Sequence, residues 1–233
     1  MFGMLVGSVF DGLAVSTSLL MELHSLIQQR VLEPPTWPLV FEASFSEAYE
    51  GFSVVPSSGR WYYHYNTSSG GSKRWRVDHL EPQRNNFCGC VLPDESSSCQ
   101  LFFTPDGLYV NFPALDNECC RLCTAEGGCS PLKPDWLSRA HPTRSAGADI
   151  IDGRQCYQYC TPGAQFLDCM SYDAFGWPCR YSESWSPSPT LHIVHNLTFT
   201  SWTNHINDPH IFDLPMPCQT PCPRQFPACM NPN

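Results

Sequence analysis

Hydrophobic and polar residues alternate along much of the chain after residue 38. Leu39, Phe41, Ala43 and Phe45 are separated by residues that are mostly polar. A period of two places alternate side chains on opposite faces of a β-strand. This run therefore predicts a half-buried strand.

Two further alternating runs predict hairpins. Residues 60–65 place Trp61, Tyr63 and Tyr65 on one face, and the Gly-Gly turn at 68–72 leads into a second run at 73–80. The segments 100–103 and 108–112 flank Thr104-Pro105-Asp106-Gly107, which is a good turn sequence.

The remaining segments have a simpler interpretation. Residues 113–130 are expected to form a cysteine-rich loop and 134–140 one helical turn. Strands are expected at 153–160, at 164–172 and, as the longest, at 191–202. Short strands at this spacing favour an antiparallel sandwich or barrel.

Proline and cysteine content divides the chain into three parts. Prolines 34, 35 and 38 disfavour a helix and mark a boundary. Residues 1–33 are expected to be a leader, either a signal peptide or an amphipathic helix. Residues 34–217 form the predicted β domain, and 218–233 a Pro/Cys-rich tail.

Fourteen cysteines in a chain of 233 residues change the picture most. Reduced cytosolic proteins rarely carry so many thiols, so the number favours disulfides and an oxidising compartment. Some pairs have zinc-like spacings, but the intervals are irregular and disulfides are favoured. The cysteines are Cys88, Cys90, Cys99, Cys119, Cys120, Cys123, Cys129, Cys156, Cys160, Cys169, Cys179, Cys218, Cys222 and Cys229.

Charge and hydropathy exclude some partners. The net charge of -9 argues against nucleic acid as a partner. No hydrophobic stretch approaches the roughly 18–20 residues of a transmembrane span. Two glycosylation sequons, at Asn66 and Asn196, agree with secretion.

The sequons also orient two strands, because a glycan requires the outer surface. Opposite Asn196 lies a hydrophobic row that contains His195, and opposite Asn66 lie Trp61, Tyr63 and Tyr65. The hydrophobic face is either a closed core or a ligand pocket. Its candidate ligand-binding residues are Phe41, Phe45, Trp61, Tyr63, Leu101, Phe103, Leu108, Val110, Ile193, Leu197 and Phe199.

Candidate chemistry is sparse. No nucleophile elbow, zinc-protease motif or phosphate-binding loop is present. Glu42 and Glu47 carry no signal by themselves, and His192 and His195 point to opposite faces of a strand. His195 is expected to be a hydrogen-bonded core histidine. Asp116, Asn117 and Glu118 offer oxygen ligands for calcium, without an EF-hand pattern.

Several segments, in order, resemble the ependymin-related proteins. These are Phe41–Phe45, Trp61–Tyr65, Arg74-Trp75-Arg76-Val77-Asp78, the pair 101–103 and 108–110 followed by Cys119-Cys120, and the stretch from Leu191 to Cys218 with its Asn-Asp-Pro. The resemblance covers roughly residues 37–220. The chain departs from the family pattern in its many extra cysteines and in Pro134-Asp135-Trp136-Leu137.

The resemblance implies a mainly β fold, an antiparallel curved sheet or half-open barrel like that of lipoprotein carriers. It also implies a secreted or lysosomal glycoprotein with a pocket for a hydrophobic small molecule or lipid. It implies calcium in some members and a homodimer in many. No other cofactor is expected.

Three functions follow as hypotheses. The first is a non-catalytic protein that binds a lipid-like ligand in a β-sheet pocket. The second is a secreted hydrolase or transferase whose carboxylates converge only in the fold. The third is an extracellular adhesive or matrix protein. A deep apolar cavity favours the first, and a polar cleft with convergent carboxylates favours the second.

Overall fold

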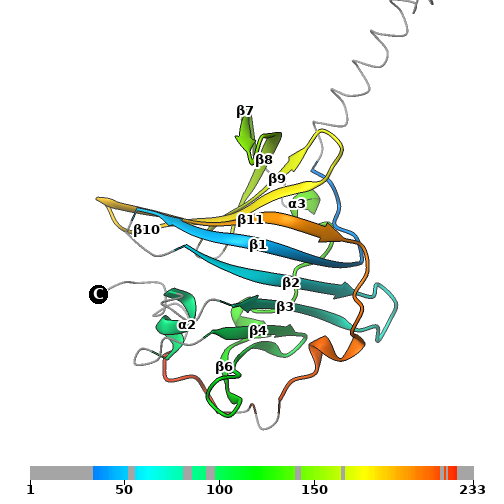
Figure 1. Ribbon diagram of the computed structural model, residues 1–233, viewed down its shortest axis with the longest axis vertical. Coiled ribbons are helices and arrows are strands. Elements are labelled where there is room, and N and C mark those ends of the chain that lie inside the picture. Colours follow the sequence, from blue (N-terminus) through cyan, green and yellow to red (C-terminus); the bar gives the residue numbers. More distant parts are fainter. Residues whose placement is uncertain are drawn as a thin grey trace, which may run out of the picture. The chain divides into compact units, whose positions relative to one another are not determined.

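Eleven β-strands pair into one antiparallel sheet in the order β6-β5-β4-β3-β2-β1-β11-β10-β9-β8-β7 (Figure 1). The computed structural model describes residues 34–51, 56–80, 86–92, 98–139, 143–163, 166–215, 218 and 220–224. The order is linear, with β6 and β7 at the edges, so the sheet does not close on itself. The predicted mainly β, antiparallel and unclosed sheet is confirmed.

The strands are β1 (Val40–Glu50), β2 (Ser57–Tyr65), β3 (Lys73–His79), β4 (Cys99–Thr104), β5 (Gly107–Phe112), β6 (Glu118–Thr124), β7 (Thr143–Ile151), β8 (Arg154–Pro162), β9 (Leu167–Asp173), β10 (Pro178–Ser188) and β11 (Leu191–Thr203). The short helical segments are α2 (Asn86–Val91), α3 (Trp136–Arg139), η1 (Ala125–Gly127) and η2 (Pro209–Phe212).

The alternating runs form the strands they predict. The two expected hairpins are β2–β3 and β4–β5, and β11 is the longest of these strands with 13 residues. Phe41, Ala43 and Phe45 are buried in β1, whereas Leu39 lies just before it and is 47% exposed. Helix α3 falls within the expected segment 134–140.

Three elements differ from the sequence-based expectation. The segment expected to be a cysteine-rich loop contains strand β6, which pairs with β5. The sequence did not predict this strand, because its cysteines interrupt the alternation of hydrophobic and polar residues. Strands β7 and β10 were not expected either. Strand β10 contains Pro178 and Pro187, and proline is unfavourable within a sheet.

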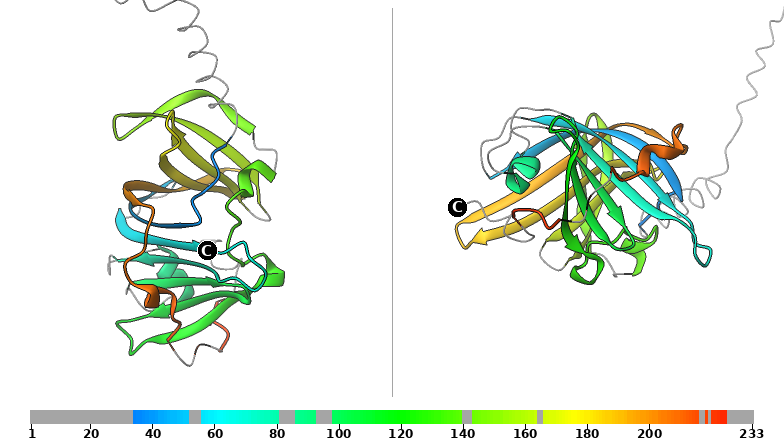
Figure 2. Two further views of the ribbon diagram at one scale, coloured as in Figure 1. Left: turned by 90° about the vertical axis from the view of Figure 1, so that its right-hand side faces the viewer. Right: turned by 90° about the horizontal axis from the view of Figure 1, so that it is seen from below.

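The sheet is strongly curved, as Figure 2 shows from two directions. Trp61 on β2 and Tyr181 on β10 lie three strand positions apart, about 14 Å in a flat sheet. Their ring centroids are nevertheless 5.4 Å apart. The two side chains can meet only because the sheet bends toward its hydrophobic face, which is therefore the concave face.

A segment between β6 and β7 packs onto the concave face. Tyr63 donates a hydrogen bond of 2.7 Å from its hydroxyl to the carbonyl of Leu132. The backbone N–H of Trp37 donates to the carbonyl of Pro134 at 3.0 Å. Leu137 is 1% exposed and belongs to the same hydrophobic cluster. This segment closes part of the concave face.

Helix α2 packs beside β3 and β4. The Cys88–Cys99 disulfide joins it to the start of β4, and the ring of Phe87 stacks on His79 at 5.8 Å. The helix is thereby held at the end of β3 where His79 lies.

The convex face carries its own buried cluster. Arg76 bonds Asp78 through two nitrogens, at 2.6 and 2.8 Å, and its guanidinium lies 4.8 Å from the ring of Phe102. A third guanidinium nitrogen donates to the carbonyl of Ile211. The segment after β11 is therefore fixed to the outside of β3.

Six disulfides lie in the described part of the chain, and no described cysteine is free. They are Cys88–Cys99, Cys119–Cys218, Cys120–Cys222, Cys123–Cys129, Cys156–Cys179 and Cys160–Cys169. Cys90 is disulfide-bonded as well, and Cys229 lies outside the described residues. The disulfide interpretation is confirmed over zinc for these twelve paired residues.

The C-terminal segment protects one edge of the sheet. Arg121 on β6 exchanges backbone hydrogen bonds with Thr220 and Cys222, at 2.8 and 3.0 Å. An added segment of this kind covers hydrogen-bonding groups that an edge strand otherwise exposes. The described part of the predicted tail is thus extended and tied down by disulfides at Cys218 and Cys222.

Two other expectations concern the chain as a whole. The leader expected at 1–33 lies outside the described residues. Among the helices of the described part, none is long and apolar enough to cross a membrane.

Candidate functional site: a hydrophobic pocket with an acidic end

A partly open pocket of about 200 Å³ lies on the concave face. Such a volume exceeds that of the dry cavity of about 150 Å³ known to accept benzene in another protein. Its wall is mainly hydrophobic, and one end carries ionisable side chains. The lining residues are Trp61, Trp75, Val77, His79, Phe87, Leu101, Phe103, Leu108, Gly127, Gly128, Cys129, Ser130, Leu132, Phe166, Asp168, Tyr181, Glu183, His195 and Leu197.

Three stacked aromatic rings form one wall of the pocket. Trp61 stacks on Trp75 at 4.8 Å, and Trp75 stacks on Phe103 at 3.9 Å. The rings come from β2, β3 and β4, which are neighbours in the sheet. The indole N–H groups of both tryptophans are buried and have no hydrogen-bond partner among the described residues.

The structure divides the predicted ligand-binding residues between the pocket and the closed core. Trp61, Leu101, Phe103, Leu108 and Leu197 line the pocket. The others do not line it: Phe41, Phe45, Tyr63, Val110 and Phe199 belong to the surrounding hydrophobic cluster, and Ile193 is buried outside that cluster. The concave face is therefore partly core and partly pocket.

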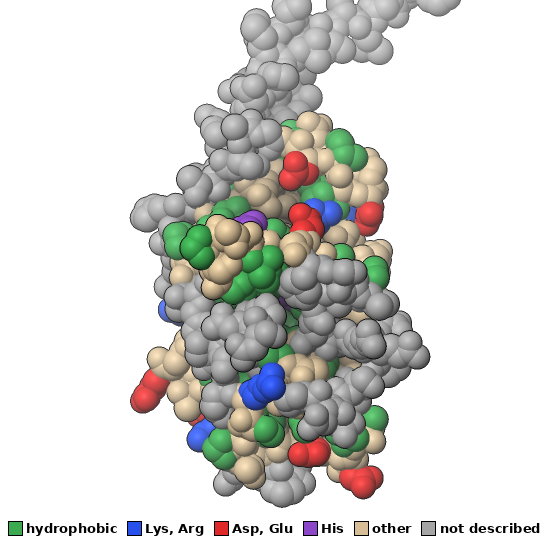
Figure 3. Space-filling view, turned by 90° about the vertical axis from the view of Figure 1, so that its left-hand side faces the viewer, with side chains coloured by type: hydrophobic (Ala, Val, Ile, Leu, Met, Phe, Trp, Pro, Cys, Tyr) green, Lys and Arg blue, Asp and Glu red, His purple; other side chains and the backbone are tan. Residues whose placement is uncertain are grey.

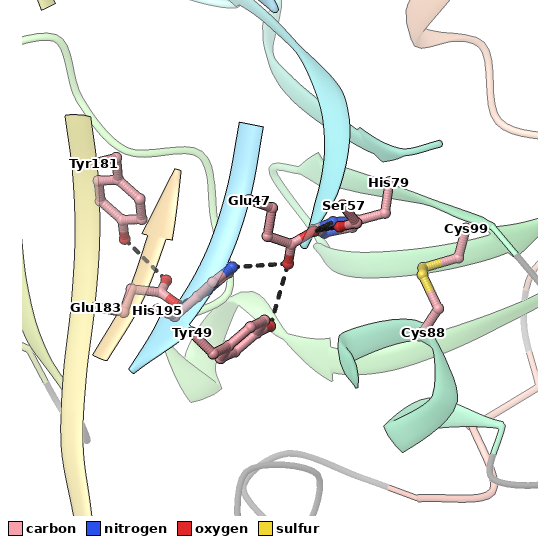
Figure 4. Close-up of polar contacts among 9 residues, drawn as sticks. All are labelled: Glu47, Tyr49, Ser57, His79, Cys88, Cys99, Tyr181, Glu183 and His195. Carbon is pink, nitrogen blue, oxygen red and sulfur yellow. Dashed lines mark hydrogen bonds and ion pairs between the residues drawn. A yellow bond between two sulfur atoms is a disulfide. The ribbon is translucent and has the colours of Figure 1, made fainter. Parts of the chain in front are cut away.

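Glu47 does not line the pocket but contacts two residues of its polar end, His79 and His195, and it is 1% exposed. One carboxylate oxygen lies 2.8 Å from Nε2 of His195 and accepts from the Tyr49 hydroxyl at 3.2 Å. The other lies 2.9 Å from Nδ1 of His79 and accepts from the Ser57 hydroxyl (Figure 4). Both oxygens are thus fully engaged.

The pKa of Glu47 lies well below its ordinary value. Burial by itself would raise that pKa, but the nearby His79 and His195 outweigh burial and stabilise the carboxylate. Glu47 is therefore ionised over the physiological pH range.

His195 is the cationic partner of Glu47. Burial would lower its pKa, but hydrogen bonds to Glu183 and Glu47 and their charges raise the pKa to about 9. Its Nδ1 lies 3.3 Å from Glu183, and its ring stacks on Tyr49 at 4.3 Å. The protonated imidazole thus forms a buried ion pair with Glu47.

Two further carboxyl groups face each other at the pocket wall. Asp168 on β9 lies directly opposite Glu183 on β10 in the sheet. The Tyr181 hydroxyl lies 3.2 Å from one and 3.0 Å from the other. Burial and the charge of Glu183 raise the pKa of Asp168 to about 7, despite the Tyr181 hydrogen bond.

Sequence reasoning missed this cluster, although part of its signal was present. The alternation Phe41, Ala43, Phe45 continues to Glu47, so the parity of β1 already placed this glutamate on the hydrophobic face. His195 was correctly expected to be a hydrogen-bonded core residue, and His192 is exposed as expected. The pairing of Asp168 with Glu183 required the unpredicted strand β10.

The two sequons have different environments. Asn66 is exposed. Asn196 is 7% exposed, donates to Glu50 at 2.8 Å and accepts from Ser182 at 2.7 Å. The expectation of an exposed Asn196 is wrong, because the neighbouring strands bury its amide on the convex side. Glycosylation at either site stays a prediction.

The backbone conformation of the loop between β5 and β6 accounts for the presence of Asp and Asn there. Asp116 and Asn117 have φ values of 51° and 58°, a left-handed conformation that Asp and Asn tolerate. Among the described residues, no group of three or more His, Cys, Asp or Glu side chains is placed to hold a metal ion. Calcium at this loop stays a prediction.

The pocket can accept a small hydrophobic group at its aromatic wall and a polar group at its acidic end. Figure 3 shows one face of the molecule on which hydrophobic side chains are exposed beside a histidine, with acidic and basic side chains nearby. No Lys or Arg is among the described residues that line the pocket. The fold and the pocket thus define a curved, unclosed antiparallel sheet with a hydrophobic cavity on its concave face.

Comparison with known proteins gives only distant likenesses. No protein-family model and no curated protein matches the sequence. A LolA superfamily protein from Nitrosomonas europaea is similar in structure, with 13% identity, 81% of this chain and 96% of that chain covered, and a TM-score of 0.35. A domain assigned to an outer membrane lipoprotein-sorting protein from Vibrio parahaemolyticus is similar as well, with 8% identity, 78% of this chain and 91% of that chain covered, and a TM-score of 0.33. These TM-scores are too low to bear on function.

Proposed function

We propose that this chain is a non-catalytic binding protein, secreted or lysosomal, that holds a hydrophobic ligand in the pocket on the concave face. The observation that carries the proposal is the partly open, aromatic-walled cavity of about 200 Å³. Concave, mostly apolar cavities with few polar groups are the usual form of small-molecule sites. The six described disulfides support an oxidising compartment.

The size of the pocket sets the length of chain that it can bury. Each buried methylene contributes about 0.8 kcal/mol, or roughly a fourfold gain in affinity. In a series of linear alcohols measured by calorimetry, affinity should rise by this factor per carbon and then level off when the cavity is full. Absence of binding by every alcohol would overturn the proposal.

A variant at the pocket entrance separates binding from folding. Ser130 lines the pocket and is exposed, so Ser130→Trp should obstruct the cavity without disturbing the core. Glu126→Trp is the matched control, because Glu126 is exposed on the adjacent turn and does not line the pocket. Alcohol binding should be lost in the first variant and retained in the second.

A variant of the wall gives a second test. Leu197→Asp places a carboxylate against the hydrophobic wall, and an unpaired buried charge is costly. Thr200→Asp adds the same charge at an exposed position of β11. Binding should be lost only in Leu197→Asp, with unchanged far-UV circular dichroism and intact disulfides.

One observation favours a second candidate function, a hydrolase or transferase. Asp168 and Glu183 converge on Tyr181 at the pocket wall, and a carboxyl group with a pKa of about 7 is suited to general acid–base catalysis. Turnover of ester or glycoside substrates that Glu183→Gln abolishes, at unchanged stability, would favour the enzyme over the carrier.

The kinship with ependymin-related proteins remains a proposal. Two segments that carry the resemblance are in contact, because the Arg76 guanidinium of the Arg-x-Arg strand bonds the Ile211 carbonyl of the segment after Asp208-Pro209. This contact gives both motifs a structural reason to occur in one chain. The test is the sequence of a close homologue. If the kinship is real, a homologue that lacks one of the two segments should have altered the other as well, and a homologue that keeps one segment without the other would contradict it.

A further inference from the structure

The acidic end of the pocket determines which polar group a hydrophobic ligand can carry. Four of the described residues that line the pocket are acids or histidines: His79, Asp168, Glu183 and His195. The charge of His195 is matched by that of Glu47, which lies 2.8 Å from its Nε2. His195 also lies 3.3 Å from Glu183, so one imidazolium is shared by two carboxylates, and Asp168 adds a third carboxyl group. No Lys or Arg is among the described residues that line the cavity.

The carboxyl pair retains capacity to accept hydrogen bonds. Tyr181 has one hydroxyl proton for two carboxyl groups, so it cannot satisfy both at once. Among the described residues, the hydrogen bond found for Asp168 is that from Tyr181 to Oδ1, so its second oxygen stays available as an acceptor. The Glu183 side chain is 21% exposed, so it is accessible from the pocket side. A ligand with N–H donors and a positive charge would complete this pair.

The aromatic wall offers ring faces beside the carboxyl pair. Trp61 is 1% exposed and lines the cavity, and its N–H has no partner among the described residues. The same is true of the N–H of Trp75, at 7% exposure. These buried N–H groups would need an acceptor, which an ammonium group does not offer, so the ring faces and not the N–H groups are the part of the wall that suits a cation. The ring of Trp61 also packs against Tyr181, beside the carboxyl pair.

We infer that the pocket binds an amphiphile whose polar group is a protonated amine, held by Asp168 and Glu183, with its apolar chain against Trp61, Trp75 and Phe103. An ammonium group gains from the opposite charge of the carboxylates, and the Trp61 ring, which packs against Tyr181 beside them, adds one aromatic face. A carboxylate, as in a fatty acid, meets like charges at the same place. This inference rests on the proposed hydrophobic-ligand function and names its ligand class.

Three ligands with the same eight-carbon chain test the amine preference separately from the proposed binding of hydrophobic ligands. Octylamine, octanol and octanoic acid are titrated into the full disulfide-bonded chain at pH 8 by calorimetry. Octylamine should bind at least tenfold more tightly than octanol, and octanoic acid more weakly than octanol. If none of the three binds, the hydrophobic-ligand function fails. If octanol or octanoic acid binds as tightly as octylamine, the function stands and the amine inference is overturned.

Charge-removing variants test the assignment of residues. Glu183→Gln should lower octylamine affinity about tenfold, toward that of octanol, and leave octanol affinity unchanged. Asp168→Asn is the second variant, because Tyr181 is its only described hydrogen-bond partner and folding should tolerate it. Asp213→Asn removes an acid whose side chain is 60% exposed outside the pocket and serves as the control. An undiminished amine preference in both pocket variants would overturn the assignment.

Discussion

Replacement of Glu47 by Gln is the most informative test of the buried polar cluster. Glutamine has nearly the same shape but no charge, and its amide N–H₂ would meet groups that donate. The change leaves protonated His195 without its closest anionic partner, at 2.8 Å, within a site where Glu47 is 1% exposed. Breaking a buried ion pair from one side costs about 3–5 kcal/mol.

That cost is large relative to the free energy of unfolding of a whole domain. A domain is stable by about 5–15 kcal/mol, and at this chain length each kcal/mol lowers Tm by about 2–4 °C. Glu47→Gln should therefore unfold about 6–20 °C earlier in calorimetry, with disulfides intact. Guanidinium unfolding monitored by tryptophan fluorescence should give the same loss of free energy.

A control variant and a double variant show whether the loss of stability comes from the broken ion pair. Glu42→Gln changes a glutamate of the same strand that is not fully buried, and it should shift stability by no more than about 0.5 kcal/mol. In the double variant with His195→Gln, the loss should be smaller than the sum of the single losses by at least about 1 kcal/mol. If Glu47→Gln is as stable as the Glu42 control, the ion-pair reasoning is wrong.

The other predictions concern pH, glycans and thiols. The raised pKa of His195 gives stability that is complete below about 6.5 and is lost as pH rises through about 9, which denaturation across pH 6–10 should show. Octylamine binding should weaken as pH falls through about 7, where Asp168 is protonated beside Glu183 and Tyr181, and Asp168→Asn should remove that step in calorimetry. Glycosidase treatment of protein secreted by eukaryotic cells should remove a glycan that Asn66→Gln abolishes, whereas an unchanged mass would contradict the exposure argument. Alkylation of denatured, unreduced protein should label no thiol among the twelve paired cysteines, and labelling of four or more would contradict the disulfides.

The sequence by itself determined which side of each strong strand is hydrophobic. Parity is a local property, because every second side chain of a strand shares a face whatever the rest of the fold does. Trp61 and Leu197 could therefore be placed on one hydrophobic face from their own strands. The number of cysteines likewise predicted disulfides, since thiol chemistry depends on the compartment rather than on the fold.

The tertiary structure alone decided which part of that face is open. Phe41 and Tyr63 alternate just as Trp61 does, yet they are closed core, because Trp37 and the segment that contains Leu132 pack over them. No local pattern reveals where a distant segment will cross a sheet. The division between core and pocket is therefore invisible in the sequence.

The acidic end depended on pairing between strands. Asp168, Glu183 and His195 lie on three different strands, and each is unremarkable by itself in a chain with 22 acidic residues. They become a site because the register places Glu183 opposite both of the others, across neighbouring strands. Register between strands is fixed by the whole sheet and its curvature, so only the folded chain could bring these charges to the pocket.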